Sequence, residues 1–141
     1  MGRVQTLHGG CVIELIIPGE PVAKGRPRVT SKGFSYTPEK TKGYENLVKM
    51  CWQESGLTGL GNKPLSVIIS LYFSVPKSYL SKFNKHGLEH TKKPDLDNCA
   101  KTILDALNGL AYDDDSQIVE LTIRKQYSTL HNCAVVRIKE D

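Results

Sequence analysis

The sequence lacks the features that mark several protein classes. Its 141 residues hold four widely spaced cysteines and no Cys-x-x-Cys pair; they are Cys11, Cys51, Cys99 and Cys133. This spacing argues against a zinc site and predicts reduced thiols in a reducing compartment. No apolar run approaches the roughly 20 residues of a membrane span. The first residues also lack the charged start and apolar stretch of a signal peptide, so we expect a cytoplasmic protein with no membrane partner.

The length is that of one domain covering residues 1–141. Residues 1–10 show no hydrophobic periodicity, and we expect them to form a loose terminus. The formal charge is +4, but it is unevenly distributed. Residues 94–121 carry seven acids against one base, a net of −6, which leaves +10 for the rest. An acidic pocket in a basic surface is what cleavage of a phosphodiester requires.

Hydrophobic periodicity predicts two helices and four main strands. The strands are expected at 11–17, 65–75, 117–127 and 133–138, the last two as a hairpin with Val119, Leu121 and Ile123 pointing inward. One helix is expected to start at the N-cap Thr37 and run to 54 with Trp52 in the core, and the other to start at the N-cap Asp97 and run to about 110. These elements predict an α+β fold in which a single-layer mixed or antiparallel sheet has helices packed on it.

Acidic residues lie at both ends of the second helix. Asp95 and Asp97 precede it and Asp115 follows it, so an antiparallel return strand could bring the three together. A hard divalent cation requires oxygen ligands, which such a cluster would supply. The alternative is that Asp95 and Asp97 only cap the helix and that residues 113–115 form a solvated turn.

Basic residues alternate along an extended, proline-containing segment near the N-terminus. Lys24, Arg26 and Arg28 would share one side of it and could line a phosphate groove, although a charged strand edge is the alternative. After the turn that follows, Tyr36 would either pack against the protein or stack near the nucleic acid, and packing is expected. A second basic segment, 76–93, has the length of a lid or short helix.

Two groups of motifs resemble the RusA-type Holliday junction resolvases. The first comprises Lys93-Pro94-Asp95-Leu96-Asp97-Asn98-x-x-Lys101, Asp105-Ala106-Leu107-Asn108-Gly109 and Asp114-Asp115-Ser116-Gln117-Ile118. The second comprises Pro18-Gly19-x-Pro21-x-x-Lys24-Gly25-Arg26-Pro27-Arg28 and Tyr36-Thr37-Pro38. Together they span most of the chain.

The resemblance implies a small homodimeric endonuclease that binds four-way DNA junctions and nicks opposed strands in DNA recombination and repair. It implies Mg²⁺ as the cofactor, for which Mn²⁺ could substitute. Carried over by residue, the metal-binding and catalytic acids are Asp95, Asp97 and Asp115, and the catalytic lysine is Lys101. Lys101 would stabilise transition-state charge or help to position the water.

One departure from the family pattern concerns the third acid. Three consecutive acids stand at 113–115 where the family usually has a pair, and the Ser116-Gln117-Ile118 register selects Asp115, with Asp114 as the second choice.

Lys93 joins the three cations of the N-terminal segment as a predicted DNA contact. Two alternatives remain: another Mg²⁺-dependent nuclease acting on flaps or branched DNA, and a non-catalytic DNA-binding module.

Overall fold

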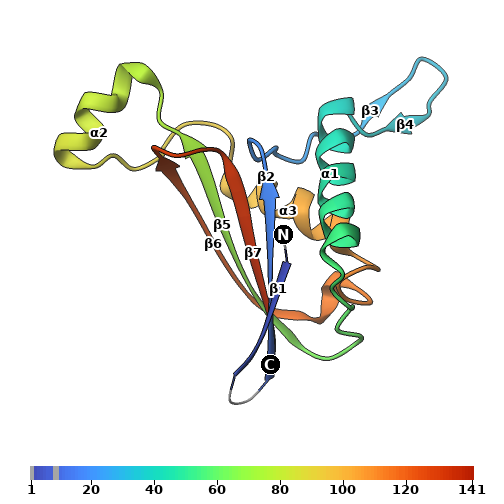
Figure 1. Ribbon diagram of the computed structural model, residues 1–141. Coiled ribbons are helices and arrows are strands. Elements are labelled where there is room, and N and C mark those ends of the chain that lie inside the picture. Colours follow the sequence, from blue (N-terminus) through green and yellow to red (C-terminus); the bar gives the residue numbers. More distant parts are fainter. Residues whose placement is uncertain (1, 8–9) are drawn as a thin grey trace.

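A five-stranded mixed sheet forms the centre of the protein (Figure 1). The computed structural model describes residues 2–7 and 10–141, with side chains described from residue 12 onward. The strands are β1 (Gly2–Leu7), β2 (Gly10–Pro18), β5 (Leu65–Ser74), β6 (Ile118–Ser128) and β7 (Cys133–Glu140). Their order is β1-β2-β7-β5-β6, and only β5 and β6 run parallel. The expected α+β class with a single mixed sheet is confirmed.

The remaining elements cover the sheet or project from it. The helices are α1 (Glu39–Ser55), α2 (Leu80–His86) and α3 (Leu96–Leu107), with short 3-10 turns η1 (Lys77–Tyr79) and η2 (Asp115–Gln117). A separate hairpin is formed by β3 (Arg28–Val29) and β4 (Ser35–Tyr36). Figure 1 shows α2 and this hairpin projecting on opposite sides of the upper part of the molecule. No helix among residues 2–7 and 10–141 is long and apolar enough to cross a membrane.

The core lies between the sheet and the two longer helices. Alternate residues of β5 are buried, as the period-two pattern predicts, and α1 contributes Tyr44, Val48 and Trp52. The prediction that Trp52 belongs to the core is therefore confirmed. The buried face of α3 consists of Cys99, Ala100, Thr102, Ile103, Leu104, Ala106 and Leu107. The polar side of α3 therefore faces the solvent.

The predicted hairpin of the last two strands is wrong. β5 lies between β6 and β7, parallel to the first and antiparallel to the second. Alternation within a strand fixes which face is buried but carries no information on its neighbours. The four-residue connection therefore joins two strands that are not paired with each other.

Val119 and Leu121 were expected to point inward; Leu121 lies opposite buried Val67, on the core side of the sheet, but neither side chain is buried. Val119 is 61% exposed and Leu121 41%, whereas Ile123 is half-buried. A register shift between Leu65 and Ser66 interrupts the pairing at the start of β6, which is the edge strand of the sheet. Side chains at such an edge have a neighbouring strand on one side only.

Smaller corrections concern the N-terminus and the helix starts. Gly2–Leu7 forms β1 by pairing with β2, so the expected loose terminus is wrong there, while residues 1 and 8–9 lie outside the described residues. Main-chain pairing with a neighbouring strand does not require an apolar periodicity.

The N-caps of α1 and α3 are Pro38 and Asp95, not Thr37 and Asp97. Tyr36 is 48% exposed, so the expected packing of this ring is wrong.

Candidate functional site

The loop that enters α3 carries the first predicted acid. Asp95 is the N-cap residue of α3 with an extended backbone, but its side chain makes no capping hydrogen bond within the described chain. Its carboxylate instead accepts a hydrogen bond from Lys93 Nζ at 2.9 Å, and both side chains are at least half exposed. The cap expected under the structural alternative is therefore not formed by this carboxylate.

Lys125 of β6 forms hydrogen bonds to the backbone of this loop. Lys125 Nζ donates hydrogen bonds to the carbonyl oxygens of Lys92, at 2.6 Å, and Pro94, at 2.9 Å. Lys125 lies opposite Leu71 in the β5–β6 register, on the buried side of the sheet. Lys125 was not predicted from the sequence, although a lysine in the inward series Ile123, Lys125, Tyr127 was a usable signal. The two bonds restrain the backbone immediately before Asp95.

Asp97 and Lys101 lie one turn apart on the exposed side of α3. Neither forms an ion pair within the part of the chain that the structure describes. The next carboxylate on this side, Asp105, pairs with Lys24 at 3.1 Å and not with Lys101. The ammonium of Lys101 and the carboxylate of Asp97 are thus both presented to solvent.

A turn held by side-chain hydrogen bonds carries the third predicted acid. Asp114 caps η2 by accepting a bond from the Ser116 amide at 3.1 Å, while the Asp114 amide donates to Gln117 Oε1 at 2.9 Å. Gln117 Nε2 also donates to the carbonyls of Gly61 and Lys63. The bonds from Ser116, with a longer one from Asn108, hold the pKa of Asp114 below its usual value.

This network distinguishes between the two candidate acids of the turn. The carboxylate of Asp114 is engaged as a helix cap, whereas Asp115 is exposed and forms no ion pair within the described residues. Tyr112, which precedes the turn, is buried and donates from its hydroxyl to the Leu104 carbonyl at 2.6 Å, so the turn is attached to α3. Burial, reinforced by the nearby charge of Asp115, raises the pKa of this phenol.

Lys24, one of the predicted phosphate contacts, forms two ion pairs within the protein. Its ammonium lies 2.6 Å from a carboxylate oxygen of Glu45 and 3.1 Å from one of Asp105. Burial alone would lower the pKa of Lys24, but the bonds to these two carboxylates outweigh it and raise the pKa. The Lys24 amide donates to the Asn98 carbonyl at 2.9 Å. Lys24 therefore connects the N-terminal basic segment to α1 and α3.

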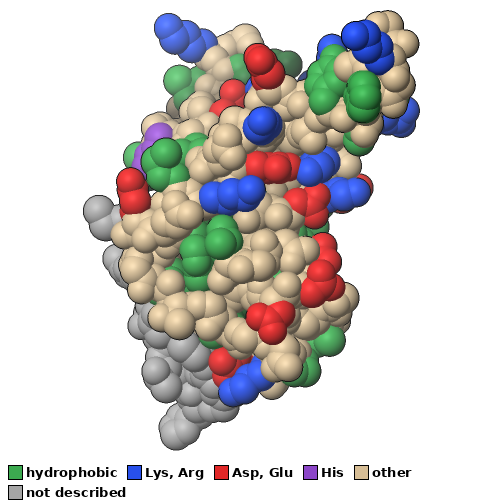
Figure 2. Space-filling model, turned by 90° about the vertical axis from the view of Figure 1, so that its right-hand side faces the viewer, with side chains coloured by type: hydrophobic (Ala, Val, Ile, Leu, Met, Phe, Trp, Pro, Cys, Tyr) green, Lys and Arg blue, Asp and Glu red, His purple; other side chains and the backbone are tan. Residues whose placement is uncertain are grey.

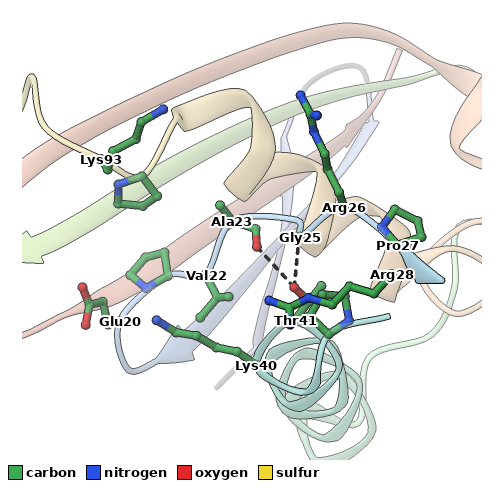
Figure 3. A pocket seen from close by; sticks show the side chains of 13 residues that line it. Glu20, Val22, Ala23, Gly25, Arg26, Pro27, Arg28, Lys40, Thr41 and Lys93 are labelled. Atoms are coloured by element: carbon green, nitrogen blue, oxygen red, sulfur yellow. Dashed lines mark hydrogen bonds between the residues drawn. The ribbon is translucent and has the colours of Figure 1, made fainter. Parts of the chain in front are cut away.

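The same segment also approaches the start of α1 closely. Thr41, which is buried, accepts a bond from the Gly25 amide at 3.0 Å and donates to the Ala23 carbonyl at 3.4 Å (Figure 3). A Cβ added to Gly25 would lie 2.9 Å from a Pro38 side-chain carbon, so only glycine fits this approach without a shift. The approach places the following arginines beside α1.

A basic cavity of about 620 Å³ lies between this segment, α1 and the loop before Asp95. Figure 3 shows Lys93 on one side, with Arg26 and Arg28 on the other and Lys40 below. Glu20 is the one acid among the lining residues. Three of the four predicted DNA contacts thus line one cavity, and Lys40, which the sequence analysis missed, joins them.

The structure does not gather the three predicted acids into one cluster. Residues 12–141, whose side chains are described, contain no group of three His, Cys, Asp or Glu side chains placed to hold a metal ion. His86 and His90 stand four residues apart, but His86 is exposed on α2 and His90 is buried against Phe73 and Tyr127, so they form no metal site together. The donor chemistry nevertheless fits magnesium, which keeps several waters and commonly takes one or two carboxylates together with substrate phosphate.

Comparison with known proteins agrees with the motifs. The family model described as "Endodeoxyribonuclease RusA" matches residues 18–139. The protein "Uncharacterized protein YqaN" of Bacillus subtilis (strain 168) is 37% identical over 125 residues, which cover 82% of this chain and 88% of that protein. Membership of the family implies endodeoxyribonuclease activity and binding of branched DNA junctions. The chain belongs to the RusA endodeoxyribonuclease family.

Proposed function

We propose that this protein is a magnesium-dependent endonuclease that resolves Holliday junctions by paired symmetric nicks in DNA recombination and repair in the cytoplasm. The proposal rests on a difference between two sets of side chains around α3: one set holds the backbone, and the other is free to contact a substrate. Lys125, Asp114 and Gln117 support the backbone, while the motif side chains Asp97, Lys101 and Asp115 remain exposed and without ion pairs among the described residues. Exposed carboxylates without structural partners are available to a cation and a phosphate.

The proposed metal ligands are Asp95, Asp97 and Asp115. Bound there, Mg²⁺ would lower the pKa of a water molecule and polarise the phosphoryl oxygen. Asp95 and Asp97 stand two residues apart, and Lys125 restrains the backbone immediately before Asp95. Asp115, on the separately anchored turn, would complete the set.

Lys101 has the role of a cation beside the reacting phosphate. It follows Asp97 by one helical turn and projects from the same exposed side of α3. A fixed positive charge there stabilises the negative charge that develops on phosphate oxygens in the transition state. Arg26, Arg28 and Lys93 would bind the phosphates next to the scissile one, because they line the cavity beside Asp95.

Two symmetric nicks require two sites related by a two-fold axis, so we also propose a homodimer. The edge strand β6 supports this proposal because it exposes Val119 and Leu121. An exposed apolar edge strand is a favoured surface for pairing with another chain. Asp115 precedes β6 by only three residues, so pairing along β6 would bring the two sites near the axis.

One observation favours the non-catalytic alternative. The three acids are not assembled into a metal site within the described part of the chain, which a module that only binds DNA would not require. Metal-dependent cleavage of DNA distinguishes the two functions. A DNA-binding module would bind junctions without metal-dependent cleavage, whereas the proposed enzyme assembles its ligands around the cation and the DNA.

The experiment that tests the proposal is a cleavage panel. The full-length protein is incubated with a synthetic four-way junction, a flap and a matched duplex, each with and without Mg²⁺. We expect paired symmetric nicks in the junction only, and only with Mg²⁺. Cleavage of the flap in preference to the junction would support a different branched-DNA nuclease, and tight binding without cleavage under Mg²⁺ or Mn²⁺ would support the binding module.

A further inference from the structure

The β3–β4 hairpin has a defined tip that projects from the body of the protein (Figure 1). Its tip is closed by three hydrogen bonds that all involve Thr30. The Thr30 amide donates to the Phe34 carbonyl at 2.7 Å, the Gly33 amide donates to the Thr30 carbonyl at 2.9 Å, and the Phe34 amide donates to Thr30 Oγ1 at 3.1 Å. Gly33 has φ 84°, which favours glycine at this position. The projection is thus a folded element.

The hairpin exposes large apolar side chains. Phe34 at the tip is 70% exposed, Val29 is 69% exposed and Tyr36 is 48% exposed. A projecting hairpin has no core of its own to bury them. Three such side chains within the eight residues 29–36 form a patch that is suited to a binding partner.

The surroundings of this patch are cationic. Residues 26–40 contain four bases against one acid, Glu39; the bases are Arg26, Arg28, Lys32 and Lys40. The face shown in Figure 2 has hydrophobic side chains beside Lys and Arg side chains at its upper end, at the height where Figure 1 places the hairpin. Positive charge around aromatic rings matches a polyanion that carries flat apolar groups, which is a nucleic acid.

The hairpin is also continuous with the candidate active site. A second cavity of about 470 Å³ at its base is lined by Arg28, Tyr36, Pro38, Glu39 and Lys40. It shares Arg28, Pro38 and Lys40 with the larger cavity, which extends to Lys93 and Pro94 beside Asp95. A DNA strand that follows this groove from the scissile phosphate would arrive at the hairpin.

We propose that the β3–β4 hairpin recognises the branch point of its DNA substrate, with Phe34 stacking on a nucleobase that the branch leaves exposed and Tyr36 supporting the strand at the hairpin base. The inference rests on the proposed function and supplies its specificity for branched DNA. In a continuous duplex, each internal base is covered on both faces by its neighbours. Bases at a branch point can be unstacked, and aromatic side chains bind exposed base faces with little sequence preference.

The test compares binding of a four-way junction and a duplex of the same sequence by the full-length protein, without divalent metal so that no DNA is cleaved. The junction carries 2-aminopurine at the branch point. We expect Phe34→Ala to weaken junction binding roughly tenfold while duplex binding changes less than about twofold, because only the branch offers an exposed base. The change in 2-aminopurine fluorescence seen with the wild type should also be lost.

Three further variants sharpen this comparison. Phe34→Tyr keeps the ring and should restore the junction preference. Lys32→Met should weaken binding of both DNA shapes equally, since phosphate contacts do not distinguish them. Leu130→Ala, on the turn between β6 and β7, removes an apolar side chain that is 83% exposed and should change neither.

The outcomes separate this inference from the proposed function. A wild type that prefers the junction, with an equal preference in Phe34→Ala, would overturn the role of the hairpin and leave the proposed function intact. A dimeric wild type whose Phe34→Ala variant is monomeric would show that the hairpin binds a second copy of the chain, which also overturns the inference. A wild type without any junction preference would contradict both.

Discussion

Lys125→Met tests whether the loop before Asp95 must be held in place for cleavage. The substitution removes a charged donor that bonds the Lys92 and Pro94 carbonyls at 2.6 and 2.9 Å but keeps a side chain of similar length. Hydrogen bonds from charged donors contribute roughly 1.5–3 kcal/mol each, and the carbonyls regain water when the loop opens. We therefore assign about 2 kcal/mol to the pair together, which corresponds to a roughly 30-fold lower nicking rate if the reaction needs the closed loop.

The assay is single-turnover nicking of a four-way junction at saturating protein with Mg²⁺, with junction binding measured alongside. Arg124→Met is the matched control, because Arg124 is the neighbouring residue of β6 and its one ion pair among the described residues is a 3.6 Å contact with exposed Glu89. We expect a slower rate for Lys125→Met, nearly unchanged junction affinity, and wild-type behaviour for the control. A Lys125→Met protein that nicks at the wild-type rate, or that loses binding as much as rate, would refute this account.

Two more predictions concern the stability and assembly of the protein. Burial, and then the charge of Lys125, lower the pKa of His90 from its ordinary 6.5, so the unfolded chain takes up the proton first and stability is lost as the pH falls below about 6.5. His90→Phe, which can keep the stack on Tyr127, should make urea stability less dependent on pH between roughly 7.5 and 5; an unchanged pH dependence would show that another group is responsible. Leu121→Glu should shift the dimer to monomer in light scattering while Lys49→Glu on α1 does not, and a monomeric wild type would contradict the proposed use of β6.

Periodicity within elements was sufficient to predict most of the fold. The buried faces of α1 and α3 and the alternation of β5 follow from where apolar residues recur, and Trp52 is in the core as expected. The insertion of β5 between β6 and β7 could not be predicted in this way, because pairing depends on which backbones meet across the sheet. The strand β1 was missed for the same reason.

The candidate site, like the fold, could be predicted only in part from the sequence. Motif spacing identified the helix that carries Asp97 and Lys101 and the turn that carries Asp115, and the structure exposes all three. Spacing could not show that the ammonium of Lys24 would be bound by Glu45 and Asp105, since Glu45 is distant in sequence. The separation of the predicted acids was equally hidden, because it depends on where the turn after α3 meets the sheet.

The two acids of the turn illustrate what the structure adds to a motif. Asp114 and Asp115 are the same type of residue, and in the sequence only the register of the following residues favoured Asp115 as the metal ligand. In the fold, Asp114 accepts the Ser116 amide as a cap, and its pKa is lowered by that bond. This local role supports the proposal that Asp115 is the ligand.

The most direct test of the central claim is single-turnover nicking of a four-way junction with Mg²⁺ by three variants, Asp97→Asn, Asp115→Asn and Asp113→Asn. Asp113 is the control, because it is exposed, adjacent to the turn and without an assigned role. We expect the first two to lose at least about 100-fold in rate while junction binding is kept, since loss of a carboxylate removes a metal ligand without weakening phosphate contacts. Wild-type rates in Asp97→Asn or Asp115→Asn, or an equal loss in Asp113→Asn, would contradict the assignment of this site.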